Sequence, residues 1–512
     1  MLIRPSPRDI GLNREEWRPH QFEACESIAE TKKRVVVVEG PTGTGKSYIA
    51  AGTTKLTGSK AFILTANHSL QDQYVDEGIG EKVIGRANYP CILPSAMPDQ
   101  AEEFGVTKNT TVDIAPCASG FDCPVRSECP YFVDVARAMK AQISVHNYHY
   151  WLPESTHVKR FTGADLLWAD EGHLLDDTLC EFSTVNLPDG LLQLMERKGL
   201  DLPDKGIENV DTWVEYGKMA SRVAMMAATD HLPGTVERAK WKKRVSLFDS
   251  LSNLSKDGSW VVTPSGIGIK VEPVWPVDTL EILLGTGGNK KAKKLVIMSA
   301  TILNLGMFSD VLGINQDEIE FIKLPWVFPP DSRPIYYRPV ASVTKETSGA
   351  AAKPLAMTID GIIDRRVGEK GIIHTHSFDL LNKIYANLSC KDRIIPHFRG
   401  MNRAELIKEF KEHRGDKWLM SPSVTHGEDF SYDVARCQVI VKMPFPDQGN
   451  KVTRMRMNQK PWWYKYQTAK VVIQQIGRVT RAADDYGETF ILDSKFDSLL
   501  TIMPKEIKEA MR

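Results

Sequence analysis

A short segment near the amino terminus has the residue types and spacing of a phosphate-binding loop. It runs from Val35 to Ser47, reads VVVVEGPTGTGKS and contains the pattern G-x-x-x-x-G-K-S. Glycines let successive backbone N–H groups converge on an anion, and a lysine adds a mobile positive charge for the β and γ phosphates. The serine hydroxyl that follows suits Mg²⁺. The residues assigned to this predicted nucleoside triphosphate site are Gly40, Thr42, Gly43, Thr44, Gly45, Lys46 and Ser47.

An acidic pair that follows an apolar run is a second candidate for the same chemistry. Leu166 to Ala169 has the length and composition of a short buried strand, and Asp170 and Glu171 come directly after it. An aspartate at the carboxyl end of such a strand can hold Mg²⁺, and the adjacent glutamate can orient and deprotonate the attacking water. Two adjacent acids are also common on surfaces, but the preceding strand favours the catalytic interpretation.

Polar residues at both ends of the chain extend this candidate site. Arg18 and Gln21 lie just upstream of the loop and could read the edge of an adenine base, although such a pair alone is a weak signal. Near the carboxyl terminus we expect a last helix over about residues 469–481. On that helix Gln474, Arg478 and Arg481 would project from one face. The two arginines are either a solvated stripe or groups that stabilise γ-phosphate charge in the transition state.

Half of the cysteines gather in a region of short irregular pieces. Cys91, Cys117, Cys123 and Cys129 each have a proline beside them, which suits a loop held at a ligand. The nucleotide motif implies a reducing compartment, which argues against disulfides. The spacing lacks the closely paired cysteines typical of structural zinc. An iron–sulfur cluster suits it better, but zinc sites also vary, so spacing alone leaves both open.

Composition sets outer limits on the interpretation. With 512 residues, the chain exceeds what one hydrophobic core usually serves, so we expect three or four folding units. Lys plus Arg and Asp plus Glu are both 65, so any surface for nucleic acid must be local. Neither a long apolar run nor a signal peptide is present, so we expect a cytoplasmic protein with no membrane partner.

The elements that must position these residues alternate between strands and helices. A strand, the phosphate loop, a helix and another strand follow one another over residues 35–65, which predicts a parallel α/β sheet. A second α/β unit is expected from about residue 306, with strands over 371–375, 418–421 and 439–442. Between them, residues 180–285 contain amphipathic helical runs without a catalytic signature. The fold class predicted from these patterns is α/β.

The order of these features resembles the iron–sulfur branch of superfamily 2 helicases, the XPD/DinG-like family. The matching motifs are Gly40 to Ser47 (motif I), Thr65 to Gln73 (Ia), Asp170 to His173 (II), Ser299 to Thr301 (III), Gly371 to Ser377 (IV), Gly427 to Asp429 (V) and Gln474 to Arg481 (VI). The segments Gly85 to Cys91 and Cys129 to Tyr131 resemble the cluster-binding segments of that family. Motif II departs from the DEAH pattern because Gly172 replaces its alanine.

This resemblance implies two RecA-like parallel-sheet motor domains with two inserts. The first motor domain would comprise residues 1–80, 143–180 and 290–305, and the second would comprise residues 306–512. An iron–sulfur domain would occupy residues 81–142, and a short helical Arch-like insert would occupy residues 181–289. The Arch-like insert is short for the family.

The resemblance also implies the cofactors and residue roles. ATP and Mg²⁺ would bind at the phosphate loop and Asp170, with Asp429 of motif V beside the nucleotide. Glu171 would be the catalytic base, and Gln474, Arg478 and Arg481 would act from the second motor domain. The cysteines Cys91, Cys117, Cys123 and Cys129 would hold a 4Fe-4S cluster.

The function implied is an ATP-dependent helicase that moves along single-stranded DNA, 5′ to 3′, and unwinds duplexes. Its partners would be single-stranded and forked DNA, and we expect a monomer. A loading or repair partner stays unidentified. Two alternatives remain: a DNA translocase or RNA-directed ATPase without unwinding, and a metal-stabilised module that binds nucleotide without turning it over.

Overall fold

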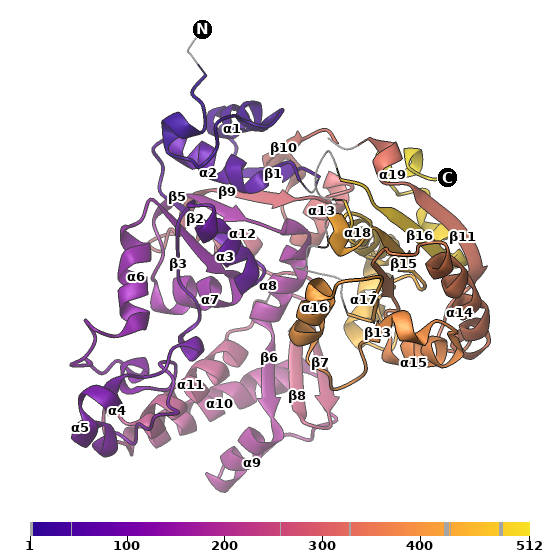
Figure 1. The fold of residues 1–512 in the computed structure, drawn as a ribbon. Coiled ribbons are helices and arrows are strands. Elements are labelled where there is room, and N and C mark those ends of the chain that lie inside the picture. The colour runs from indigo at the N-terminus through magenta and orange to yellow at the C-terminus, as the bar shows by residue number, and fades with distance from the viewer. Residues whose placement is uncertain are drawn as a thin grey trace.

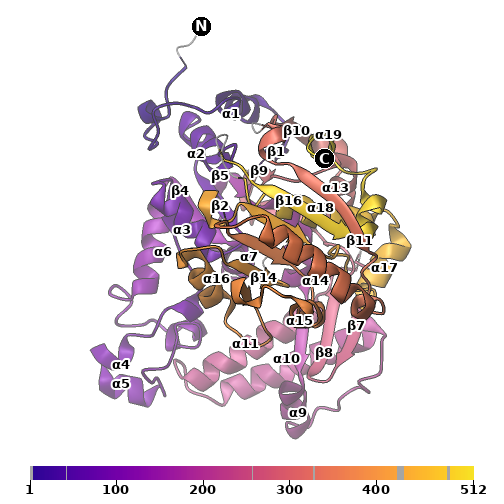
Figure 2. The same ribbon diagram turned by 45° about the vertical axis from the view of Figure 1, so that its right-hand side comes forward.

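Two parallel α/β sheets form the body of the protein, and two inserts extend from the first of them (Figure 1). The computed structural model describes residues 4–41, 43–256, 258–326, 329–423, 430, 432–480 and 485–512. In both views the sheet of the amino-terminal half and the sheet of the carboxyl-terminal half lie side by side (Figures 1 and 2). The predicted α/β class with two parallel-sheet domains is therefore confirmed.

The first sheet has the strand order β10-β1-β9-β5-β2-β4-β3, and all of its neighbouring strands are parallel. Val35 and Val37 face one hydrophobic core and Val36 and Val38 face another, so β1 is covered on both sides, as the run of valines predicts. The strands are β1 (Val35–Glu39), β2 (Ala61–Thr65), β3 (Glu81–Lys82), β4 (Ile143–Asn147), β5 (Ala164–Ala169), β9 (Ala292–Ser299) and β10 (Ile319–Lys323). The helices are α1 (Gln21–Glu30), α2 (Lys46–Leu56), α3 (His68–Asp76), α6 (Pro130–Lys140), α7 (Tyr148–Pro153), α8 (Leu175–Ser183), α12 (Thr279–Leu284) and α13 (Leu305–Leu312).

The boundary between the motor domains lies later than the predicted residue 306. Strand β10 pairs along its whole length with β1, with Val37 opposite Phe321. Helix α13 and β10 therefore belong to the first domain, and the second begins after Lys323. The sequence argument stopped at motif III, which left this edge strand on the wrong side of the boundary.

The second sheet is also fully parallel, in the order β11-β16-β15-β12-β14-β13. Its strands are β11 (Ile335–Ala341), β12 (Gly371–His374), β13 (Ile394–Pro396), β14 (Trp418–Ser421), β15 (Cys437–Ile440) and β16 (Glu488–Asp493). Its helices are α14 (Ser348–Asp364), α15 (Phe378–Asn387), α16 (Arg403–Glu412), α17 (Lys451–Gln459), α18 (Trp463–Ile476) and α19 (Lys505–Glu509). In the described parts of the chain, no helix combines the length and apolar character needed to span a membrane.

Both inserts leave the first sheet on the same side and touch each other (Figure 1). The cysteine-containing insert carries the short helices α4 (Leu93–Ala96) and α5 (Pro98–Glu103). The other insert has α9 (Asp189–Arg197), α10 (Val210–Thr229) and α11 (Val236–Ser252), and strands β6 (Val185–Pro188), β7 (Trp260–Ser265) and β8 (Gly268–Pro273). The Val236 N–H donates to the Phe104 carbonyl at 3.1 Å, and Lys243 Nζ lies 2.6 Å from Asp113 Oδ2.

The Arch-like insert is not purely helical. Strands β6, β8 and β7 form an antiparallel sheet that packs under α9, α10 and α11. Strand β6 alternates buried and exposed residues over only four positions, too short a pattern for recognition in the sequence. The prediction of helices alone was therefore incomplete for this insert.

Side chains of α17 and α18, in the second motor domain, contact this insert. Arg456 is buried, and its Nε donates to the Val274 carbonyl at 2.6 Å while Nη1 lies 3.1 Å from Asp177 Oδ1. Its guanidinium lies over the rings of both Trp275 and Trp463, each at 5.2 Å from the centroid. Val274 and Trp275 belong to the insert and Asp177 belongs to α8 of the first domain, so α17 and α18 contact both.

Candidate active site

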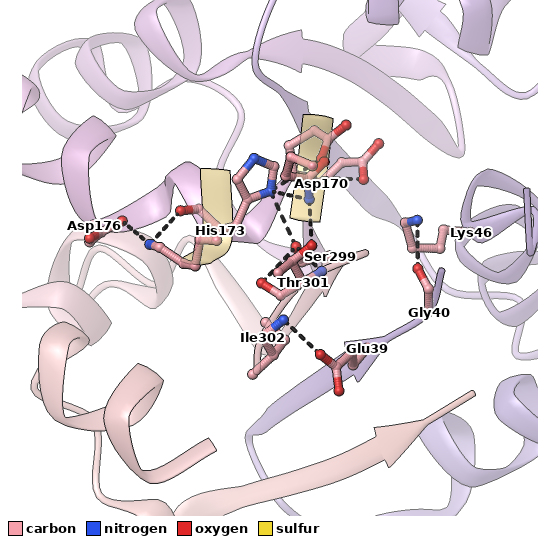
Figure 3. Close-up of polar contacts among 12 residues, drawn as sticks. Glu39, Gly40, Lys46, Asp170, His173, Asp176, Ser299, Thr301 and Ile302 are labelled. Atoms are coloured by element: carbon pink, nitrogen blue, oxygen red, sulfur yellow. Dashed lines mark hydrogen bonds and ion pairs between the residues drawn. The ribbon is translucent and has the colours of Figure 1, made fainter. Parts of the chain in front are cut away.

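The phosphate loop has the conformation that its glycines allow. Gly43 and Gly45 have φ angles of 85° and 73°, values that side chains with a Cβ rarely adopt. Lys46 begins α2, and its Nζ donates to the Gly40 carbonyl at 2.9 Å (Figure 3). The predicted strand, loop and helix are all present, while Thr42 lies outside the described residues. The amino-terminal end of α2 therefore faces the space where the loop would hold phosphates.

Arg18 and Gln21 contact the loop itself. Gln21 is buried, and its Nε2 donates to the carbonyls of Thr44 at 2.8 Å and Gly45 at 3.0 Å. The Arg18 guanidinium donates to the Gly43 carbonyl. A Cβ at Gly45 would lie 2.3 Å from Gln21 Nε2, so this contact also requires the glycine. The pair braces the loop, and its reading of an adenine edge stays a prediction.

The motif II aspartate is buried at the end of β5, in the network drawn in Figure 3. Asp170 Oδ2 accepts from the Tyr74 hydroxyl at 2.9 Å, and Oδ1 accepts from the Glu171 N–H at 2.9 Å. Burial is the main cause that raises the pKa of Asp170 to about 6, with the Glu171 carboxylate acting in the same direction and Lys46 opposing it. The buried Asp170 carboxylate and the Ser47 hydroxyl of the loop are oxygen donors of the kind that Mg²⁺ prefers, so these residue types fit the metal.

Glu171 and His173 link motif II to motif III. Glu171 has a φ angle of 52°, which is uncommon for a residue with a side chain, and its Oε2 lies 3.3 Å from His173 Nδ1. The same His173 nitrogen is 3.2 Å from Ser299 Oγ. The candidate base Glu171 thus has a strained backbone conformation. It lies next to β9, the strand between β5 of motif II and β1 of the phosphate loop.

The close packing around Gly172 accounts for the departure from the DEAH pattern at this position. A Cβ at this position would lie 2.2 Å from Ile297 Cγ2 and 3.2 Å from the Met298 carbonyl oxygen. Both belong to β9, the strand next to β5. Motif II therefore approaches β9 too closely for alanine in the observed packing.

Helix α18 brings the second motor domain onto motifs II and III. Gln474 Nε2 donates to Thr301 Oγ1 at 2.8 Å and lies 3.4 Å from His173 Nδ1. Two further residues of the helix make similar contacts: Lys470 Nζ donates to the His173 carbonyl at 2.9 Å, and the Tyr466 hydroxyl donates to the Ile302 carbonyl at 3.0 Å. Gln474 therefore lies at the junction between the two halves of the chain, and its catalytic role stays a prediction.

The prediction that Arg478 shares a helical face with Gln474 is wrong. Helix α18 ends at Ile476 with Gly477 as its C-cap, so Arg478 lies in the turn that follows. The apolar pattern continues past the glycine, which is why the expected helix ran too far. Arg478 is buried, and its positive charge helps to lower the pKa of His374, after burial and His376. Arg481 lies outside the described residues, as does Asp429.

The predicted cysteine ligands lie in one region without forming a closed metal site. Burial raises the pKa of the Cys91 thiol, and the neighbouring thiols of Cys123 and Cys129 raise it further. Burial raises the pKa of Cys117 to about 11, with Cys123 the next contributor. These mutual effects show that the thiols lie near one another. Among the described residues, however, no three His, Cys, Asp or Glu side chains are arranged to hold a metal ion.

Three residues near the site, Glu77, Tyr74 and Glu39, make contacts that the sequence did not predict. Ser47 Oγ donates to Glu77 Oε2 at 3.0 Å, Tyr74 holds Asp170, and Glu39 Oε1 accepts from the N–H groups of Ile302 at 2.9 Å and Leu303 at 3.0 Å. Figure 3 shows Glu39 beneath motif III. Glu39 precedes the loop glycine directly, so its place was foreseeable, but its partner was not. Glu77 and Tyr74 follow motif Ia at positions without a recognised pattern.

Comparison with known proteins gives matches over both motor domains. A family model described as "Helicase C-terminal domain" matches residues 363–510, and one described as "Type III restriction enzyme, res subunit" matches residues 14–175. The chain is 22% identical to the ATP-dependent DNA helicase YoaA of Escherichia coli strain K12, over 94% of this chain and 92% of that protein. These matches support an XPD/DinG-like superfamily 2 helicase. Members of this family hydrolyse ATP, which agrees with the phosphate loop and motif II of this helicase.

Other relatives of the helicase support the same fold. A solved structure titled "XPD_Helicase" aligns with a TM-score of 0.66 at 15% identity, covering 96% of this chain and 98% of that one. The structure of S. tokodaii Xpd4 aligns with a TM-score of 0.59 at 14% identity, covering 97% and 99%. A regulator of telomere elongation helicase 1 homolog from Drosophila persimilis is 24% identical, over 26% of this chain and only 16% of its own length.

Proposed function

We propose that this helicase moves along single-stranded DNA, in the 5′ to 3′ direction, and unwinds forked duplexes at the expense of ATP. The observation that carries the proposal is the contact of Gln474 with Thr301 and His173. It joins a helix of the second motor domain to motifs II and III of the first. A change at the nucleotide therefore reaches the other domain through direct contacts. The direction of movement rests on the family resemblance.

Residues of the first domain would bind the phosphates, hold Mg²⁺ and activate the water in ATP hydrolysis. Lys46, which in this structure donates to Gly40, would bind the β and γ phosphates of ATP. Ser47 and Asp170 would hold Mg²⁺, which when bound neutralises phosphate charge and orients the triphosphate. Glu171 lies next to this site with a partly exposed carboxylate, and it would orient and deprotonate the attacking water.

The second domain would complete the site when the cleft closes. Arg478 and Arg481 follow the end of α18 and would reach the γ-phosphate from the opposite side. Gln474 would keep motif III aligned with them through Thr301. Because no single domain holds all of these groups, hydrolysis requires the closed arrangement, and loss of the γ-phosphate favours opening. Repeated closing and opening would move one domain relative to the other along DNA.

A strand-displacement assay separates this proposal from its alternatives. ATPase rates are measured with single-stranded DNA and with RNA, followed by unwinding of duplexes that carry either a 5′ tail or a 3′ tail. We expect stimulation by DNA and unwinding of the 5′-tailed duplex. Lys46→Ala and Glu171→Gln should abolish hydrolysis, with circular dichroism as the control for folding. Hydrolysis without unwinding would support a translocase, preference for RNA would support an RNA-directed ATPase, and full activity of Lys46→Ala would exclude the assigned site.

We further propose that Cys91, Cys117, Cys123 and Cys129 hold a 4Fe-4S cluster. The mutual influence of their thiols and their shared region support it, although the described residues do not form a closed site. Anaerobically purified protein should be coloured and contain iron, and Cys117→Ser should lose the colour and the unwinding while keeping much of the ATPase activity. Cys390→Ser is the matched control, because Cys390 is buried in the second motor domain. A colourless, zinc-containing wild-type protein would contradict the cluster.

A further inference from the structure

The last turn of α3 contacts both predicted magnesium ligands. Ser47 Oγ donates to Glu77 Oε2 at 3.0 Å, and the Tyr74 hydroxyl donates to Asp170 Oδ2 at 2.9 Å. Glu77 caps the carboxyl end of α3, three residues after Tyr74, so both side chains project from one face of the same turn. One short helical segment thus contacts a ligand on the phosphate loop and a ligand on motif II.

The direction of the Ser47 hydrogen bond matters for metal binding. A hydroxyl has one proton and two lone pairs. When the proton points to Glu77, the lone pairs of Ser47 point away from that carboxylate and are available to a cation. Outer groups that orient metal ligands in this way contribute to metal affinity although they never touch the metal.

The charges around the loop lead to the same assignment. The carboxylates of Asp170 and Glu171 and the ammonium of Lys46 influence one another. Burial is the main cause that lowers the pKa of Arg18, Arg14 acts in the same direction, and Glu77 opposes them. Counted formally, these six side chains carry three negative charges and three positive ones. A nucleotide brings further negative charge, which a divalent cation compensates.

We propose that Glu77 is a positioning residue of the magnesium site, which fixes the hydroxyl of Ser47 so that its lone pairs face the metal. Tyr74 has the corresponding role for the Asp170 carboxylate. This inference rests on the proposed function, because it assumes that the loop binds Mg²⁺ together with a nucleotide. It predicts that loss of Glu77 raises the magnesium concentration that nucleotide binding requires, while binding measured without magnesium is unchanged.

The opposite effect of Glu77 is the main competing explanation. If the bond between Ser47 and Glu77 competed with the metal for the hydroxyl, removal of the carboxylate would lower the magnesium concentration that the protein needs. The two explanations therefore differ in the sign of one measured shift.

The test is a magnesium titration of nucleotide binding by the full chain. Binding of the fluorescent analogue mant-ADP is measured at increasing Mg²⁺ and, separately, in EDTA. Glu77→Ala should raise the magnesium concentration at half saturation by about tenfold, the lower end of the range for outer-shell groups. Glu77→Gln should recover part of the loss, because its amide oxygen still accepts from the hydroxyl. Asp76→Ala removes an exposed carboxylate of the same helix and should match the wild type.

A double-mutant cycle shows whether Glu77 acts through Ser47. Ser47→Ala should raise the magnesium requirement, and adding Glu77→Ala to it should change nothing further. Binding in EDTA should be equal in all variants, and urea unfolding checks that each is folded. An unchanged or lower magnesium requirement in Glu77→Ala, or additive effects in the double variant, would overturn the inference. Failure of the wild type to bind mant-ADP at any magnesium concentration would instead overturn the proposed function.

Discussion

Replacing Gly172 with alanine, the residue of the DEAH pattern, should inactivate this helicase. The added Cβ would lie 2.2 Å from Ile297 Cγ2, whereas carbon atoms pack at about 3.5 Å or more, so motif II and β9 must separate by about 1 Å. Displacement of a catalytic group by about 1 Å can cost about 100-fold in rate. Glu171 is the residue next to the substitution, so we expect kcat of the DNA-stimulated ATPase to fall by that order.

The effect on stability should be smaller than the effect on rate. Overpacking costs about 1–3 kcal/mol, and replacing glycine by alanine returns about 0.4–1 kcal/mol through the unfolded chain. Urea unfolding should therefore show a modest loss for Gly172→Ala. Gly190→Ala is the matched control, because nothing lies near a Cβ at that helical position.

A second substitution in β9 tests the cause directly. Ile297→Ala removes the clashing Cγ2, so the double variant should regain ATPase activity per folded molecule, although the cavity costs about 2–5 kcal/mol. If Gly172→Ala kept a kcat within about twofold of wild type, or if Ile297→Ala failed to restore the rate, the argument from close packing and displacement of Glu171 would be refuted.

Two further predictions concern buried lysines. Lys470→Met leaves the Asp176 carboxylate buried without its ion-pair partner and should lower the free energy of unfolding in urea by about 3–5 kcal/mol. Lys465 is exposed on the same helix, so Lys465→Met should change that free energy little. Equal losses in the two variants would contradict the role of the ion pair. Burial lowers the pKa of Lys291 from 10.5 to about 8, so between these pH values the folded protein binds fewer protons than the unfolded chain and its stability gains from rising pH. That gain should be absent in Lys291→Met and present in exposed Lys290→Met, and unfolding curves across this pH range measure it.

The sequence predicted those features whose cause is local. The buried strand of valines, the loop glycines and the acids after β5 follow from residue type and order, and the structure confirms their places. The end of α18 was foreseeable as well, since Gly477 marks it, but the motif that continues across the glycine suggested a longer helix. Local patterns therefore gave the strands of the site more reliably than the limits of its helices.

The remaining features depend on contacts between distant segments. Glu77 reaches Ser47, and Gln21 reaches the loop, only because α3 and α1 pack where the sheet places them. No periodicity encodes such pairs, and the same holds for the pairing of β10 with β1 that moves the domain boundary. The close approach of Gly172 to Ile297 was visible in the sequence only as a departure from the DEAH pattern.

The anchoring of the Arch-like insert has a mechanical consequence. The chain enters and leaves the insert through the first motor domain. Two residues of the second domain contact the insert: Arg456 donates to the Val274 carbonyl, and Gln459 accepts from the Trp275 indole at 2.6 Å. The insert is thus joined covalently to the first motor domain and held by side-chain contacts to the second. A rotation of the two domains relative to each other, as the proposed ATP cycle requires, would therefore shift the insert or break these contacts.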